Sequence, residues 1–301
     1  MHPRRNTDVR SDGFSSAAGG AGSARTLDLV QAPRLVATDV DGTLLDPDDR
    51  VTVRAAAVIG RAVAAGVGFV LVTGRPPRWI PPVAAQLGVA RLAVCANGSV
   101  LYDAVEDRVL WARTLAPDVL AELAAMVTDT FPGCGLGVER IRVGVGAFDD
   151  AASQFVAEPD YRHAWPSADH GVAARIELLA RPAVKMLVRC PELGSDAMVA
   201  ALAPVVGDAA DLTFSHPRGL VEIAPPRVTK ATGLAEVAEQ FGVGAADIVA
   251  FGDMPNDLEM LRWAGHGVAM GNAHPALLDV ADEVTASNAD DGLALVLERW
   301  F

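Results

Sequence analysis

The sequence predicts an α/β protein: a doubly wound, Rossmann-like parallel sheet that is interrupted by an inserted α+β module. Short apolar runs alternate with helical stretches at the start of the chain, a differently patterned region follows, and the alternation then returns. We therefore expect a disordered tail at 1–32, core segments at 33–112 and 214–301, and the inserted module at 113–213.

The first core segment is expected to contain three buried strands. Apolar runs at 35–37, 69–72 and 92–96 predict these strands. Helical spacing at 53–65 and a second helix ending at Leu87 lie between them. This order is typical of a parallel sheet with helices as crossovers.

The inserted module is expected to be less regular. Short alternating stretches at 140–145 and 184–189 predict strands, and glycines cluster at 133–137. After Val221-Glu222-Ile223 the alternation returns, with a helix at 230–241 and a buried strand at 248–251.

Composition limits the possible functions. The chain has 301 residues, is 51% hydrophobic and 21% charged, and carries a net charge of −13, which disfavours a broad nucleic-acid surface. A small anionic substrate needs only local positive groups and stays possible. The apolar stretch at 62–73 contains two glycines and is too short to span a membrane.

The three cysteines are Cys95, Cys134 and Cys190. They include no Cys-x-x-Cys pair, and no secretory signal precedes them, so we expect neither a disulfide scaffold nor a zinc site. A reducing cytoplasm is the expected location.

Two carboxylates follow the first predicted strand. Asp39 and Asp41 are two residues apart, so they can project to one side of an extended chain, and Gly42 permits a tight turn after them. Like charges this close favour a bound cation, and hard oxygen ligands suit Mg²⁺. Taken alone, the string is more simply explained as a surface turn. An EF-hand loop does not, because its glycine stands at the sixth position.

Other polar groups follow other predicted strands or begin a helix. Asp253 could cap a helix or bind a metal, and Thr73-Gly74 could be a plain turn or an anion site. Lys230, taken alone, would be a solvated lysine. Because ligands bind outside the carboxyl ends of parallel strands, we expect Asp39, Thr73, Asn97 and Asp253 to converge.

Taken in order, these motifs resemble the haloacid dehalogenase superfamily of phosphatases, and most closely its Cof-like sugar phosphatase branch with a type C2 cap. The resemblance covers 34–102 and 219–299, whereas the insertion matches only in size and position. The ordered series is Asp39-x-Asp41-Gly-Thr, Thr73-Gly74-Arg75, Lys230 and Gly252-Asp253-x-x-Asn256-Asp257. Further matches are Ala96-Asn97-Gly98, 268–273, Asn288 and Asp291-Gly292. Met254 departs from the polar residue that many relatives carry.

The resemblance implies a role for each matching residue. Asp39 would be the nucleophile that forms an aspartyl-phosphate, and Asp41 the general acid and base. Mg²⁺ would be held by the Asp39 carboxylate, the Asp41 backbone carbonyl and Asp253. The phosphate would be bound by Thr73, Gly74, Lys230 and Asn256, with Asp257 in support. The inserted module would close over the site and select a small phosphorylated substrate.

Alternatives remain open at this point. Cys134-x-x-Gly-x-x-Arg140 resembles the phosphate loop of cysteine-dependent phosphatases, but Gly133 replaces the usual His and a strand is expected afterwards. The stretch 161–165 is interpreted first as a surface loop and Lys185 first as a strand-edge lysine. Contact with the substrate is the second interpretation of each. A phosphomutase or phosphotransferase would use the same Asp39, and a non-catalytic binding protein is a further possibility. The patterns identify neither the substrate nor an oligomeric state.

Overall fold

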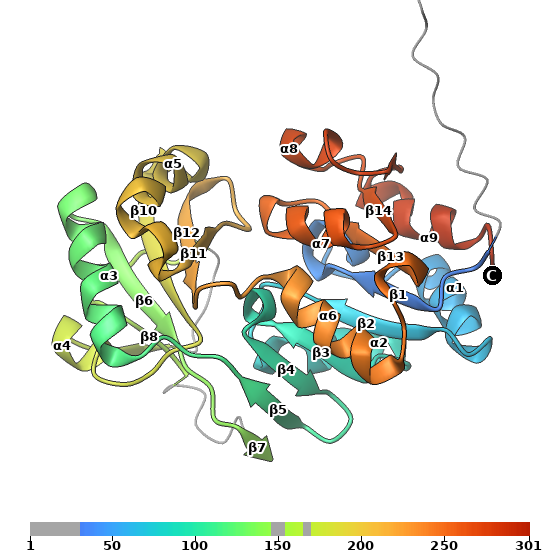
Figure 1. Cartoon of the computed structure of the whole chain (residues 1–301), viewed down its shortest axis with the longest axis horizontal. Helices are drawn as coiled ribbons and strands as arrows, with labels where there is room; N and C mark the ends of the chain where they lie inside the picture. The colour runs from blue at the N-terminus through green and yellow to red at the C-terminus, as the bar shows by residue number, and fades with distance from the viewer. Residues whose placement is uncertain (1–30, 146–153, 165–169) are drawn as a thin grey trace, which may run out of the picture. The chain divides into compact units, whose positions relative to one another are not determined.

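The computed structural model describes residues 31–145, 154–164 and 170–301. Most of the expected tail at 1–32 lies outside these residues, as does Trp165. Residues 32–301 form one compact unit that contains two sheets (Figure 1). No helix in these ranges combines the length and apolar character needed to cross a membrane.

The first sheet has nine strands. Six neighbouring strands, from β15 through β14, β13, β1 and β2 to β3, are all parallel. Strands β4, β5 and β7 continue the sheet beyond β3 with antiparallel pairing. In spatial order the strands are β15 (Glu283–Val284), β14 (His266–Ala269), β13 (Ile248–Gly252), β1 (Leu35–Thr38), β2 (Gly68–Val72), β3 (Leu92–Cys95), β4 (Val100–Asp103), β5 (Arg108–Ala112) and β7 (Gly144–Val145).

Helices cover both faces of this sheet because its strands are apolar on both sides. In β1, Val36 belongs to one buried cluster, whereas Leu35 and Ala37 belong to the other. The first cluster includes side chains of α1 (Val53–Ala64), α2 (Pro81–Leu87) and α9 (Gly292–Leu297). The second includes side chains of α6 (Lys230–Phe241), α7 (Leu258–Trp263) and α8 (Pro275–Leu278). The expected doubly wound α/β fold is confirmed.

The second sheet has six strands and is covered by helices on one face. The strands, in spatial order, are β11 (Asp211–Thr213), β12 (Arg218–Ala224), β10 (Lys185–Gly194), β6 (Gly135–Glu139), β8 (Phe155–Ala157) and β9 (Gly171–Val172). The cluster beneath it includes side chains of α3 (Pro117–Thr130), α4 (Arg175–Leu178) and α5 (Ser195–Val206).

Alternation along these strands separates two kinds of side chain. In β10, Met186 and Val188 belong to the cluster under the helices, whereas Lys185 and Leu187 do not. The antiparallel register places Lys185 opposite Glu139 and Leu187 opposite Glu222. The face without helices therefore carries buried charges.

Two local expectations differ from the structure. Of the stretch 140–145, only Gly144–Val145 is a strand, and it joins the first sheet. The strand around Val221-Glu222-Ile223 pairs with β10 and β11, so the second sheet extends to Ala224, past the expected boundary at 213.

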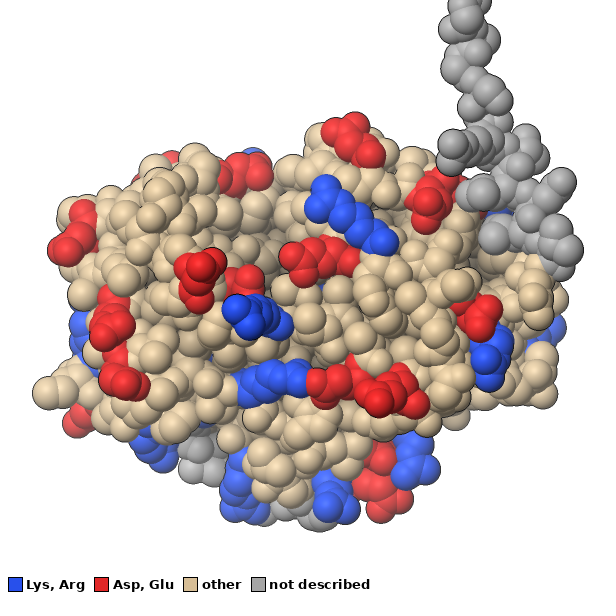
Figure 2. Space-filling model, in the orientation of Figure 1, with Lys and Arg blue, Asp and Glu red and all other residues tan. Residues whose placement is uncertain are grey.

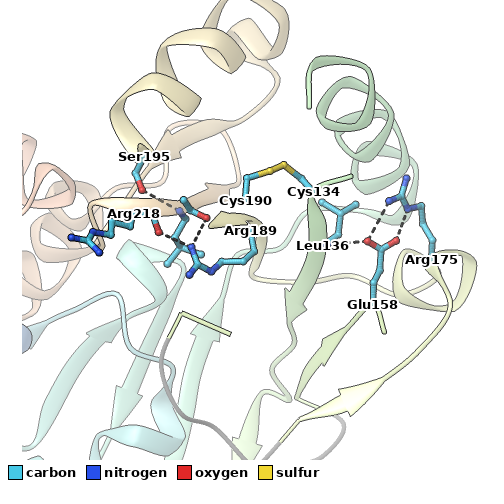
Figure 3. The surroundings of a disulfide bond; sticks show 10 residues. Cys134, Leu136, Glu158, Arg175, Arg189, Cys190, Ser195 and Arg218 are labelled. Carbon is cyan, nitrogen blue, oxygen red and sulfur yellow. Dashed lines mark hydrogen bonds and ion pairs between the residues drawn. A yellow bond between two sulfur atoms is a disulfide. The ribbon is translucent and has the colours of Figure 1, made fainter. Parts of the chain in front are cut away.

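Cys134 and Cys190 form a disulfide between the start of β6 and β10 (Figure 3). Their Cα atoms are 5.0 Å apart, a normal spacing for this bond. The pairing follows from the antiparallel register, in which Arg189 lies opposite Gly135. The sequence analysis, which expected no disulfide scaffold, did not foresee this single bond, because linear spacing does not reveal the register of two strands.

Candidate active site

The carboxyl ends of four adjacent strands bring the expected polar residues to one edge of the first sheet. Asp39 follows β1, Thr73 follows β2, Asn97 follows β3 and Asp253 follows β13, and these strands are neighbours in the order β13-β1-β2-β3. All four residues are buried. This edge is where ligands bind in open parallel sheets.

Lys230 connects two of the carboxylates. It is the first residue of α6 and fully buried, and its Nζ lies 2.9 Å from Asp39 Oδ1 and donates a hydrogen bond of 2.7 Å to Asp257 Oδ1. The second oxygen of Asp257 accepts from the backbone N–H groups of Asp253 and Met254, both at 3.1 Å. Asp257 therefore holds Lys230 and the turn after β13 in place.

A tight turn brings Asp253 against the segment that follows Asp39. Thr43 Oγ1 donates to Asp253 Oδ1 at 3.0 Å. Gly42 has a φ of +71°, and a Cβ atom there would lie only 2.3 Å from Asp253 Oδ2. Only glycine fits both the backbone conformation and this close approach.

The buried carboxylates are crowded. Asp39, Asp253 and Asp257 each offer an oxygen within 4.8 Å of the others. Burial raises the pKa of Asp39 well above its ordinary value, which Lys230 only partly opposes, and neighbouring carboxylates raise it further. Burial, with Asp257, also raises the pKa of Asp253 to about 7.

The ammonium of Lys230 is stabilised by the same neighbours. Burial alone would lower the pKa of Lys230, but Asp257 and Asp39 together raise it above its ordinary value. One cation thus faces three carboxylates, and the site has an excess of negative charge.

A divalent cation fits this site on two grounds. The excess of buried carboxylate oxygens is the donor set that Mg²⁺ prefers. Asn256 Oδ1 is also buried and has no hydrogen-bond partner among the described residues, so it is available to a ligand or to water. Asp41 is not part of the carboxylate cluster.

The Asp41 carboxylate is instead paired with Arg75. Arg75 Nε donates to Asp41 Oδ2 at 2.9 Å, and Nη2 lies 2.5 Å from Oδ1. The Asp41 side chain is 56% exposed, in contrast to Asp39, and both residues line the same cavity. Asp41 can therefore meet a substrate from the solvent side.

Thr73 and Gly74 form a turn held by the neighbouring loop. The backbone N–H of Arg75 donates to Thr73 Oγ1 at 3.1 Å, and Asn97 N–H donates to Thr73 O at 3.0 Å. Asn97 Oδ1 accepts from Asn256 Nδ2 at 3.0 Å. The expected phosphate-binding residues Thr73, Gly74 and Asn256 thus lie around Asn97.

A cavity of about 580 Å³ extends from this edge to the bare face of the second sheet. Among its lining residues are Asp39, Asp41, Gly74 and Asn256 from the first sheet's loops and Lys185, Leu187 and Glu222 from the second sheet. Ionisable side chains of both signs also lie on the surface drawn in Figure 2, without a broad basic patch. The cavity can hold a small molecule whose phosphate reaches Asp39.

Sequence reasoning missed four buried charges in this cavity. Arg78 pairs with Glu139, and Lys185 pairs with Glu222. Lys185 lies on a central strand and is 4% exposed, so its interpretation as a strand-edge lysine was wrong. For Glu139, Lys185 and Glu222 the available signal was alternation, because their strands carry apolar residues on the other face. Arg78 lies in the short helix Pro77–Trp79, where no such pattern marks it.

Two other candidates in the insertion are the stretch 161–165 and the motif that begins at Cys134. Tyr161 is buried, and it lines the cavity together with His163, so this stretch is not a plain surface loop. Cys134 is in a disulfide and precedes a strand, which excludes the cysteine-phosphatase loop as expected.

The fold and the site define a phosphoryl-handling α/β hydrolase, and comparison with known proteins identifies its family. Residues 36–297 match the model of the haloacid dehalogenase-like hydrolases, and the chain belongs to this family. It is a phosphatase of the Cof-like branch that acts on phosphate monoesters of small metabolites.

Two curated relatives illustrate the similarity. The chain is 30% identical over 274 residues to the 5-amino-6-(5-phospho-D-ribitylamino)uracil phosphatase YitU of Bacillus subtilis, covering 89% of this chain and 98% of the relative. It is 29% identical to an HMP-PP phosphatase of Cronobacter sakazakii, covering 81% of this chain and 86% of the relative.

Solved structures share the fold. BT1666 of Bacteroides thetaiotaomicron, a phosphatase of the same superfamily, superposes with a TM-score of 0.72 at 21% identity, covering 95% of this chain and 98% of that one. TM0651 of Thermotoga maritima superposes with a TM-score of 0.68 at 24% identity, covering 89% and 98%.

Proposed function

We propose that this chain is a Mg²⁺-dependent phosphatase that hydrolyses a small phosphorylated metabolite, such as a sugar phosphate, through an aspartyl-phosphate on Asp39. The observation that carries the proposal is the 2.9 Å contact between Lys230 Nζ and Asp39 Oδ1. It engages one carboxylate oxygen and fixes the orientation of the side chain, so the other oxygen can act as a nucleophile at the head of the cavity.

In the first step, the free oxygen of Asp39 attacks phosphorus and the bond between phosphorus and the substrate alcohol breaks. Asp41 donates a proton to the departing oxygen. Because Arg75 holds the Asp41 carboxylate in the structure, this role requires the pair to separate when substrate enters.

In the second step, water attacks the phosphorus of the aspartyl-phosphate. Asp41 accepts a proton from that water, the bond between phosphorus and Asp39 breaks, and inorganic phosphate leaves. Asp41 thus returns to its protonated form, and Asp39 returns to its carboxylate.

The remaining residues bind and orient the phosphate. The Thr73 hydroxyl, the turn at Gly74, Lys230 and the Asn256 side chain provide hydrogen bonds or charge, and Asp257 keeps Lys230 in position. Asp39, Asp253 and the Asp41 backbone carbonyl would hold Mg²⁺. When bound, the ion offsets the negative charge of the transferring group.

The inserted module is proposed to be the cap that selects the substrate. Lys185, Leu187 and Glu222 in its sheet line the cavity opposite Asp39, which supports this role. The relatives' names include a ribitylamino-uracil phosphate and HMP-PP, so their substrates differ in the leaving group. The names of the relatives therefore do not give the leaving group for this chain, which depends on its own cap residues.

The test compares wild type with Asp39→Asn on a panel of phosphorylated metabolites in the presence of Mg²⁺. We expect wild type to release phosphate from some of them and the variant to release none, while circular dichroism shows that both are folded. Asp48→Asn, an exposed change in the next loop, is the matched control and should keep full activity. Turnover by Asp39→Asn would overturn the nucleophile assignment.

The alternative of a phosphomutase or phosphotransferase is decided by the products. Conversion of a sugar 1-phosphate to the 6-phosphate without release of inorganic phosphate would favour it. Phosphate release in a one-to-one ratio with free sugar favours the phosphatase.

A further inference from the structure

Beyond the phosphate end, the positive charges of the cavity are already matched by carboxylates. Among the described lining residues the Lys and Arg side chains are Arg75, Arg78 and Lys185, which pair with Asp41, Glu139 and Glu222. Glu139 and Glu222 are 2% and 1% exposed. Separating such buried pairs to bind another anion would leave a carboxylate unpaired, which is costly.

The rest of this region adds negative charge. Asp49 also lines the cavity, and among the described residues it forms no ion pair. Burial and the neighbouring His170 lower the pKa of His163, so this ring is neutral at neutral pH.

The wall contributed by the second sheet is apolar and aromatic. Phe155, Tyr161 and Leu187 belong to one buried cluster, and all three line the cavity. The rings of Phe155 and Tyr161 meet edge to face with centroids 5.7 Å apart, and His163 packs edge-on against both at 5.3 and 5.0 Å. Such a wall favours a leaving group with an apolar or ring face.

We propose that the substrate is a monophosphate ester whose alcohol part carries no second anionic group and presents a ring or apolar face to Phe155, Tyr161 and His163. This inference rests on the proposed function. It excludes substrates with a carboxylate or a second phosphate on the leaving group, because Arg78 and Lys185 are held by the buried carboxylates of Glu139 and Glu222. Arg75, which Asp41 releases when substrate enters, directly follows the phosphate-binding turn at Thr73-Gly74 and serves the phosphate end.

The test uses three esters of the same primary alcohol framework: benzyl phosphate, 4-carboxybenzyl phosphate and 4-(aminomethyl)benzyl phosphate. We expect kcat/KM for the neutral and the cationic ester to exceed that of the carboxylated ester by about ten-fold at low ionic strength. The same order is expected in dissociation constants measured calorimetrically with Asp39→Asn. Equal or better binding of the carboxylated ester would overturn the inference.

The proposed preference for a leaving group with a ring is tested by comparing benzyl phosphate with ethyl phosphate. Benzyl phosphate should bind Asp39→Asn about ten-fold more tightly than ethyl phosphate, because the ring buries apolar surface against the aromatic wall. Equal binding of the two would remove that half of the proposal.

Asp49→Asn tests the charge argument within the cavity. It should improve binding of 4-carboxybenzyl phosphate about three-fold and leave benzyl phosphate unchanged. Asp48→Asn, next to it and outside the lining, should change neither value. If the proposed function were wrong, wild type would release no phosphate from any metabolite. The dissociation constants of the three benzyl esters would still show whether the cavity disfavours a second anionic group.

Discussion

Lys185 Nζ lies 2.5 Å from Glu222 Oε2, and both side chains are almost completely buried between the two sheets. Lys185 also donates to Gly74 O at 2.8 Å, and Asn97 Nδ2 donates to Glu222 Oε2 at 3.1 Å. The pair therefore connects the second sheet to two loops of the first. Because its carboxylate accepts from Asn97, it also orients the amide that meets Asn256.

Glu222→Gln should destabilise the protein by about 3 kcal/mol, because the change leaves the Lys185 ammonium buried without a charged partner. Urea denaturation measures the difference. Glu192→Gln is the matched control, since Glu192 is an exposed partner of Arg162 in the same inserted segment, and its free energy of unfolding should not change. Equal stabilities of Glu222→Gln and wild type would contradict the prediction.

The stabilisation by Glu222 should depend on pH. Burial raises the pKa of this carboxyl, but Lys185 and Ser215 outweigh burial and hold the pKa below its ordinary value of 4.5. The ionised form is thus favoured by folding, so the stabilisation is present above pH 4.5 and is lost as pH falls below it. The difference between wild type and Glu222→Gln should shrink between pH 5 and about pH 3.

Gly42→Ala should weaken Mg²⁺ binding by more than about ten-fold, because the added Cβ lies where Asp253 Oδ2 now stands. Gly88→Ala is a close control: its φ is +70° against +71° at Gly42, but nothing lies within 4 Å of its Cβ. Both variants should lose about 1 kcal/mol from backbone strain. Only Gly42→Ala should raise the Mg²⁺ concentration needed for half-maximal phosphate release.

The carboxylate cluster also predicts how Mg²⁺ affinity varies with pH. Because burial raises the pKa of Asp253 to about 7, protons compete with the ion below that pH. Affinity measured by calorimetry should therefore fall between pH 8 and pH 6, by at most about ten-fold per pH unit for each proton displaced. A constant affinity over this range would contradict the assignment.

In the metal-free protein the raised pKa of Asp253 changes stability with pH in the opposite direction from the lowered pKa of Glu222. The folded state binds a proton at Asp253 more tightly than the unfolded state does, so stability should fall as pH rises from the ordinary value of 3.8 towards 7. Urea denaturation in a chelator at pH 5 and pH 8 measures this loss, and Mg²⁺ should remove it.

The sequence predicted the parts of the site that depend on local order. Asp39, Thr73 and Asp253 each follow an apolar run, and parallel strands place such positions together. Lys185 and Glu222 could not be paired in this way, because 37 residues separate them and the register of β10 against β12 comes from tertiary packing. Their alternation with apolar neighbours marked a buried face but not their partners.

The pairing of Cys134 with Cys190 also depends on a strand register, that of β6 against β10. Cys134 and Cys190 are 56 residues apart, and closing a loop of that length should stabilise the folded protein by about 4 kcal/mol through the entropy of the unfolded chain. A reducing agent should therefore lower the midpoint of urea denaturation in wild type. Cys134→Ser/Cys190→Ser should start at the lower midpoint and not respond to the reductant.

Cys95→Ala separates the bond from the loss of a thiol. Cys95 is buried in the first sheet and unpaired, so this variant should keep its response to the reductant. Thiol titration of unfolded, unreduced wild type should then find one reactive thiol among the three cysteines. Finding three would show that the bond is not formed, and the module containing β6 and β10 would then depend for its stability on its apolar cluster and on contacts such as that between Lys185 and Glu222.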